Sequence, residues 1–281
     1  MSTLVASLVL SSVLAAPPLD SARELFQRTE YEAALRLLTA QRDKDGATYE
    51  FIGRCHYILG NPKKASEAFE KAVAAEPANS GYRLWLGRAY GQRAETSSFI
   101  TAPGFATKAR QNFQKAIELD PRNAEAVNDL FEYYLEAPGI LGGGLEKASA
   151  LTERIRELDP AEYHYAQSRL AEKRRQFHTA ENQLRSAIQL APKQVGRVLD
   201  LAKFLAKQGR WEESEAAFRQ ARRLAPDSPK VLFEEAGAYI HAGRNLEAAK
   251  ELLKRYLSAP LTPDDPPRHE AEQLLKQASA Y

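Results

Sequence analysis

Three prolines divide the C-terminal half of the chain into units of equal length: Pro192, Pro226 and Pro260 lie 34 residues apart. Within the unit Val195–Pro226, apolar residues recur at helical spacing on both sides of a break at Gln208-Gly209-Arg210, which predicts two short amphipathic helices. Helices of about 12–14 residues are marginal alone in water, so each pair needs the apolar face of a neighbouring pair. The spacing therefore predicts a stack of helical hairpins.

This repeated unit resembles a tetratricopeptide repeat (TPR), a family with a period of about 34 residues. The family places a small residue between its two helices, a glycine in the turn, and a small, a large and a small residue along the second helix. The residues at these positions are Ala202, Gly209, Ser214, Phe218 and Ala221, followed by the closing Pro226. The resemblance implies an all-α fold, a right-handed α-α superhelical solenoid of about seven helix pairs with a C-terminal capping helix.

The pattern extends over nearly the whole chain, so we expect a single solenoid domain over residues 17–281. The expected repeats are approximately 19–45, 46–77, 80–121, 124–160, 161–192, 195–226 and 229–260, with a capping helix over 266–279. The first unit is degenerate, as terminal repeats commonly are, because one of their faces meets water. The unit 161–192 lacks the usual turn glycine, which leaves the register of its first helix open.

Two repeats exceed the period, because Pro121 lies 44 residues after Pro77 and Pro160 lies 39 residues after Pro121. We place the excess in two inserted loops at the turns inside adjacent repeats, within residues 91–108 and 137–144. Stacking puts such turns on one edge of a solenoid, so the loops should be neighbours, and insertions gathered on one face are typical of a binding face. The candidate contact residues are Phe99, Ile100, Phe105, Ile140, Leu141, Gly142 and Gly143. Folding back to cover the solenoid edge is an equally good interpretation of these residues.

The inner surface is the other candidate site, because in the family the first helix of each pair lines the concave groove where peptides or partner helices bind. The inward positions that we assign to partner binding are Arg54, Tyr57, Arg88, Asn128, Glu132, Tyr165, Arg169, Lys203, Phe233 and His241. Plain solvent exposure is the alternative for any single residue. The set lacks the Lys/Asn arrangement with which some relatives clamp a C-terminal carboxylate, so we do not predict that ligand.

The sequence predicts no catalytic site, metal or cofactor. None of the five histidines is spaced for metal binding, and the triple glycine is followed by Leu145-Glu146-Lys147 where a phosphate-binding loop has Gly-Lys-Ser/Thr. The single cysteine, Cys55, excludes an internal disulfide, and we interpret it as a small core residue rather than a reactive thiol. The net charge of +2 does not indicate a nucleic acid or an anionic membrane surface as partner.

The N-terminus carries the one targeting signal. Leu4–Ala16 is apolar, uncharged and short for a membrane span, and small residues precede Pro17. We interpret residues 1–16 as a signal peptide of an exported, periplasmic protein with no stable membrane insertion after its removal. Met1–Thr3 lacks Lys and Arg, so an uncleaved N-terminal anchor and an apolar capping helix of a cytoplasmic protein stay open as alternatives.

The expected function is that of a non-catalytic scaffold or adaptor that holds a protein or peptide partner in its groove or on its inserted edge. One alternative is an accessory subunit of an envelope enzyme or transporter, which the sequence does not separate from the first. Another is a helical-repeat RNA binder, because pentatricopeptide arrays have a similar period. The near-neutral charge and the small/large/small pattern speak against RNA.

Overall fold

The computed structural model describes residues 18–280, which fold into α-helices and one short 3₁₀ helix, with no strand in this range. The helices are α1 (Pro18–Gln27), α2 (Tyr31–Thr39), α3 (Gly46–Ile58), α4 (Pro62–Ala75), α5 (Ser80–Thr96), α6 (Ala102–Leu119), α7 (Ala124–Glu136), η1 (Gly139–Leu141), α8 (Leu145–Leu158), α9 (Pro160–Lys173), α10 (Phe177–Leu190), α11 (Val195–Lys207), α12 (Trp211–Leu224), α13 (Pro229–His241), α14 (Leu246–Ser258) and α15 (Arg268–Ser279). The proposed signal peptide, residues 1–16, lies outside the described residues.

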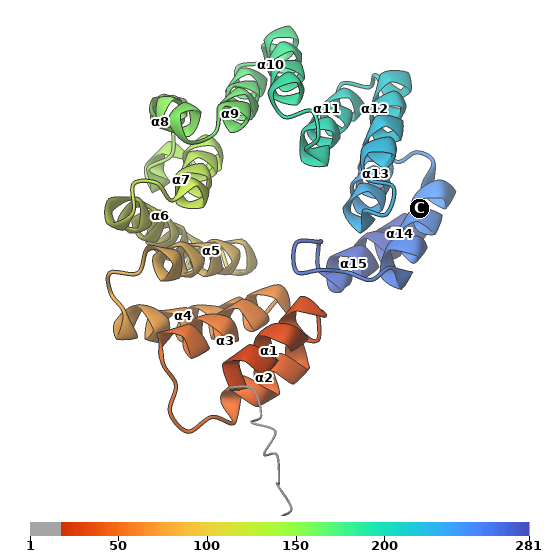
Figure 1. The fold of residues 1–281 in the computed structure, drawn as a ribbon. Helices are drawn as coiled ribbons and strands as arrows, with labels where there is room; N and C mark the ends of the chain where they lie inside the picture. The colour runs from red at the N-terminus through yellow and green to blue at the C-terminus, as the bar shows by residue number, and fades with distance from the viewer. Residues whose placement is uncertain (1–17, 281) are drawn as a thin grey trace, which may run out of the picture.

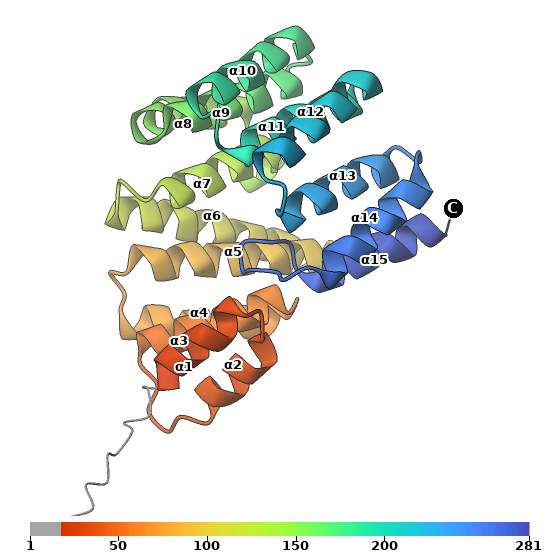
Figure 2. The same ribbon diagram turned by 45° about the vertical axis from the view of Figure 1, so that its right-hand side comes forward.

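Consecutive helices pair as hairpins from α1–α2 to α13–α14, and α15 follows alone. Figure 1 shows the first helix of each later pair, such as α5, α9 and α13, on the inner side of a curved array, with α6, α10 and α12 on the outer side. Figure 2 shows the hairpins stacked one above another along the array. The predicted all-α solenoid is confirmed.

In the hairpins α3–α4 and α5–α6, close approach of the two helices depends on a glycine that faces an aromatic ring. A Cβ atom built on Gly53 of α3 would lie 2.6 Å from the ring of Phe69 in α4, and one built on Gly87 of α5 would lie 2.5 Å from the ring of Phe113 in α6. Real Cβ atoms do not approach a ring so closely. The glycines therefore let each ring lie directly against the backbone of the partner helix.

The turn inside the hairpin requires one residue with positive φ. Gly60 and Gly209 supply it with φ of 69° and 74°, a conformation that costs glycine little. Where the sequence lacks a glycine, Thr29 and Arg175 adopt φ of 59° and 60° at the equivalent turns. The unit 161–192, whose register the sequence left open, thus makes the same turn with Arg175.

Cys55 is fully buried in the core of the first two repeats. Burial raises the pKa of its thiol to about 12, so the thiolate is absent at neutral pH. This agrees with its interpretation as a small core residue.

The first insertion is a lengthened hairpin and not a loop. α5 has 17 residues and α6 has 18, whereas α11 and α12 have 13 and 14, and only residues 97–101 connect the two long helices. Phe105, which we expected in a loop, lies in the first turns of α6, where its ring stacks on Tyr90 at 6.2 Å between centroids. The expectation was wrong because the extra residues continue the helical apolar pattern.

The two ends of the array approach each other. Tyr256 donates a hydrogen bond to the carbonyl of Pro266, which holds the segment 261–267 against α14, and α15 then packs on α13 and α14. The start of α15 lies beside the turn between α3 and α4, because a Cβ built on Gly60 would be 3.6 Å from Nε2 of His269. Figure 1 shows this C-terminal segment facing the N-terminal helices, so the superhelix nearly closes into a ring.

Substitution of Gly87 by alanine tests the close approach of α5 and α6. The added methyl group meets Phe113, so Gly87→Ala should lower the free energy of unfolding by about 1–3 kcal/mol. Gly91→Ala in the same helix meets nothing within 4 Å and should raise it by up to about 1 kcal/mol, the usual helix preference of alanine. Urea unfolding followed by circular dichroism measures the free energy of unfolding of both variants. Equal changes in the two variants would contradict the close contact between Gly87 and Phe113.

Candidate functional site

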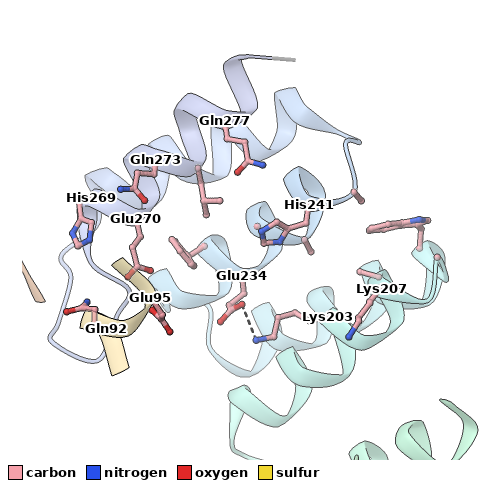
Figure 3. A pocket seen from close by; sticks show the side chains of 18 of the residues that line it. Gln92, Glu95, Lys203, Lys207, Glu234, His241, His269, Glu270, Gln273 and Gln277 are labelled. Atoms are coloured by element: carbon pink, nitrogen blue, oxygen red, sulfur yellow. Dashed lines mark ion pairs between the residues drawn. The ribbon is translucent and has the colours of Figure 1, made fainter. Parts of the chain in front are cut away.

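A cavity of about 1100 Å³ lies on the inner side of the array, where the end of α5 faces α11, α13 and α15. We call it the central cavity. Figure 3 shows side chains from all four helices around it, with those of α15 on the side opposite α11. Its lining includes Gln92, Glu95, Lys203, Lys207, Trp211, Phe233, Glu234, Gly237, His241, His269, Glu270, Gln273, Leu274 and Gln277.

Three of the predicted groove residues, Lys203, Phe233 and His241, line the central cavity. The contributions of α5 and α15 were missed, because nothing in the repeat pattern indicates that the C-terminal helix faces the third repeat across the inner side of the array. A signal was present in α15: His269, Gln273 and Gln277 recur every four residues and so share one polar face of that helix.

Most charged residues predicted for the groove instead join successive inner helices. Arg88 of α5 pairs with Asp129 of α7 at 2.6 Å, and Arg169 of α9 pairs with Glu132 of α7 at 2.9 Å. Lys203 of α11 pairs with Glu234 of α13 at 3.2 Å, as the dashed line in Figure 3 marks. These side chains are half-buried, so the cost of desolvating the charges offsets much of their attraction, and the main effect of the pairs is to fix charges in place.

Aromatic rings hold the remaining inner residues. The Arg54 guanidinium lies 4.9 Å from the ring centroid of Trp85, and Tyr57 meets the same ring edge-on at 5.6 Å. Arg169 donates a hydrogen bond to the Tyr165 hydroxyl at 3.1 Å. Asn128 is half-buried on α7 and does not line the central cavity.

A second hollow of about 650 Å³ lies between α5, α6 and α7 and reaches both insertions. We call it the edge cleft. It brings together predicted groove residues and predicted insertion residues, which the sequence treated as two sites. The predicted residues that line it are Tyr57, Arg88, Glu132, Phe99 and Leu141.

The second insertion is a tightly specified turn. The Tyr133 hydroxyl donates to the carbonyl of Leu141 at 2.8 Å, and Lys147 donates to the carbonyl of Gly142 at 2.8 Å. Gly142 has φ of 86°, and a Cβ on Gly143 would lie 1.9 Å from the carbonyl oxygen of Ala137. Gly142 and Gly143, predicted as contact residues, therefore shape the turn.

Several carboxylates on the inner face are partly desolvated. Burial raises the pKa of Asp129 and of Glu132, although Arg88 and Arg169, respectively, act to lower it. Burial likewise raises the pKa of Asp200 in α11, whose nearest cations, Arg197 and Lys203, lie 3.7 and 3.8 Å away. Asp200 is thus the carboxylate with the loosest ion pairing of the three.

Within residues 18–280, no group of three or more His, Cys, Asp or Glu side chains is arranged to hold a metal ion. None of the helices described there has the length and apolarity needed to cross a bilayer.

Comparisons with known proteins agree on the family. A tetratricopeptide repeat model matches residues 199–266, and a second tetratricopeptide repeat model matches residues 47–79. The chain is a tetratricopeptide repeat protein. No curated protein matches it.

Two solved structures resemble the fold of this TPR protein. A tetratricopeptide repeat protein from Parabacteroides merdae is 14% identical, with 93% of this chain and 97% of that chain covered and a TM-score of 0.60. A thermophilic TPR protein from Thermus thermophilus is 23% identical, with 67% of this chain and 97% of that chain covered and a TM-score of 0.55. At these identities the likeness establishes the solenoid fold alone.

Alanine substitutions test the turn of the second insertion. Gly143→Ala forces a methyl group against the backbone of Ala137, so it should lower the free energy of unfolding by about 1–3 kcal/mol. Gly139→Ala in the same turn meets nothing within 4 Å and should change it by less than about 0.5 kcal/mol. Chemical unfolding of both variants decides the matter; a tolerated alanine at position 143 would show that the turn is loosely specified.

Asp200→Asn tests the desolvation of the inner face. Because the pKa of Asp200 is raised in the folded TPR protein, the folded chain takes up a proton more readily than the unfolded chain, and the ionised carboxylate opposes folding at neutral pH. The variant should therefore be more stable at neutral pH. Its advantage should shrink as the pH falls through the raised pKa towards the ordinary value of 3.8.

Urea unfolding at neutral and mildly acidic pH measures this difference. The matched variant Asp227→Asn removes an exposed aspartate from the connection between α12 and α13 and controls for the loss of one negative charge. An advantage of Asp200→Asn that grows on acidification would show that the carboxylate stabilises the fold.

Proposed function

We propose that this TPR protein is a non-catalytic scaffold that holds an extended segment of a partner protein in its central cavity. Tetratricopeptide repeats are in general protein-interaction modules, and this supports the coarse assignment. The observation that carries the finer one is the cavity itself, about 1100 Å³ in volume and lined by α5 of the third repeat together with the C-terminal helices.

The chemistry of the lining suits a polypeptide. The side-chain amides of Gln92, Gln273 and Gln277 each donate and accept hydrogen bonds, as does a peptide backbone. Phe233 and Leu274 offer apolar surface between them. This mixture of a few polar groups with apolar walls is typical of ligand sites in proteins.

We further propose that the protein is exported and acts in the cell envelope. The apolar, uncharged stretch Leu4–Ala16 supports this, since it has the length of a signal-peptide core. A role as accessory subunit of an envelope enzyme or transporter is a special case of the same scaffold function.

Site-specific photocrosslinking in the native host tests the scaffold proposal. A benzoyl-phenylalanine at position Gln273, on the wall of the central cavity, should give a defined protein adduct. The same group at the exposed Gln220 on the outer helix α12 should not. The N-terminal sequence of the recovered chain reports in the same experiment whether residues 1–16 have been removed.

The captured partner is then purified and its affinity measured by calorimetry. Gly237 lines the cavity and has no atom within 4 Å of a built Cβ, so Gly237→Phe should fill the cavity without disturbing the fold and weaken binding at least tenfold. Gly196→Phe, at an equally open position of α11 outside the cavity lining, should leave the affinity unchanged. Equal binding by both variants, or recovery of RNA in place of a protein, would overturn the proposal.

A further inference from the structure

The edge cleft exists because one hairpin is longer than its neighbours. α5 and α6 have 17 and 18 residues, whereas α3, α4, α7 and α8 have 13 or 14. The extra turns, at the end of α5 and the start of α6, therefore extend past the helices that cover the other hairpins. Figure 1 shows α5 and α6 beside α7 on one side of the array.

Small side chains form much of the cleft surface on these extra turns. Gly91 and Ala94 of α5 lie there with Ala102 and Ala106 of α6, and all four are partly exposed. Such positions allow another backbone to come close, as Gly87 does inside the hairpin. In this hollow, however, no helix of the described chain covers them.

The most exposed large apolar side chains of the described residues all belong to the two insertions. Phe99, Ile100 and Ile140 are 87%, 74% and 92% exposed, whereas Leu190, the next in order, is 53% exposed. Phe99 lines the edge cleft, and the residues on both sides of Gly139 and Ile140, Pro138 and Leu141, line it as well. Exposed apolar groups gathered at a cleft mark an interaction site, whereas scattered ones carry no such meaning.

The charge of the cleft selects between partners. Its lining has four carboxylates, Glu95, Asp129, Glu132 and Glu136, and a single cation, Arg88. Arg88 pairs with Asp129. Arg169 of the next inner helix, α9, pairs with Glu132 and Glu136. Lys173 also pairs with Glu136.

Glu95 makes no ion pair within residues 18–280. The cleft therefore keeps an excess of negative charge beside its apolar surface, which disfavours an anionic membrane and favours a cationic partner.

We propose that the edge cleft binds an amphipathic helix of a partner protein, with large apolar side chains along one face and Lys or Arg beside them. The cleft follows α5 from Arg88 to Glu95, about 10 Å or two helical turns at 1.5 Å per residue, and continues to Phe99 beyond the end of that helix. Apolar anchors at i, i+3 and i+4 would lie over the small residues, as one helix packs on another. The inference rests on the proposed scaffold function but assigns a second surface with its own ligand.

Peptide binding to the purified full chain tests this. The probe is a fluorescent peptide about five turns long with leucines at i, i+3 and i+4 and lysines elsewhere. Fluorescence anisotropy should show saturable binding, at least tenfold tighter than that of a peptide with glutamates in place of the lysines or of one with the leucine positions scrambled. The double variant Phe99→Ser, Ile140→Ser should weaken binding at least tenfold, and Glu95→Lys should weaken it several-fold.

Leu190→Ser removes an exposed apolar side chain far along the chain from the cleft and should leave binding unchanged. Equal affinity for the three peptides, or equal loss from the double variant and Leu190→Ser, would overturn the proposal. The proposal would also be overturned if the chain cosedimented with vesicles of anionic lipid and the double variant Phe99→Ser, Ile140→Ser did not. The same holds if the chain self-associated in ultracentrifugation and the double variant did not. If peptide binding fails but photocrosslinking from position Gln273 still captures a partner, only the edge-cleft proposal is rejected. If the peptide binds but no partner is captured from Gln273, only the central-cavity proposal is rejected.

Discussion

The contact between a glycine and an aromatic ring sets how closely the two helices approach in the hairpins α3–α4 and α5–α6. Where Gly87 faces Phe113, the two helices approach until the ring touches backbone, and the same holds for Gly53 and Phe69. Successive inner helices also touch one another, as α3 does α5 and α5 does α7. An array must curve when successive hairpins lie closer together on one side than on the other. With enough hairpins, this curvature brings the two ends of the chain together.

Sequence reasoning succeeded where a local rule decides the structure. The period and the turn at Gly209 follow from the repeat pattern, so the fold was predictable. It failed for Phe105, because whether extra residues extend a helix or form a loop depends on how well they pack, here against Tyr90. It also missed His269 and Gln273, because their position depends on the accumulated curvature of all the preceding repeats, which no single repeat encodes.

The inner face carries many charged side chains, yet it can still discriminate between binding partners. Its arginines and lysines are largely taken up in pairs between repeats, such as Arg88 with Asp129 and Arg169 with Glu132. A partner that offers only charge must therefore break an existing pair and regain little. Discrimination then falls mainly to shape and apolar contact, which differ between the central cavity, with its glutamine side chains, and the edge cleft, with its exposed Phe99 and with Glu95, which is unpaired within residues 18–280.

The approach of His269 to the turn at Gly60 has a kinetic consequence. A polypeptide that lies inside a nearly closed ring and continues on both sides of it is encircled, so it escapes either by sliding lengthwise or when the noncovalent seam parts. Bulky folded domains at both ends of such a chain would block sliding. The residence time of the complex would then be set by the rate at which the ring opens, and only weakly by the contacts inside it.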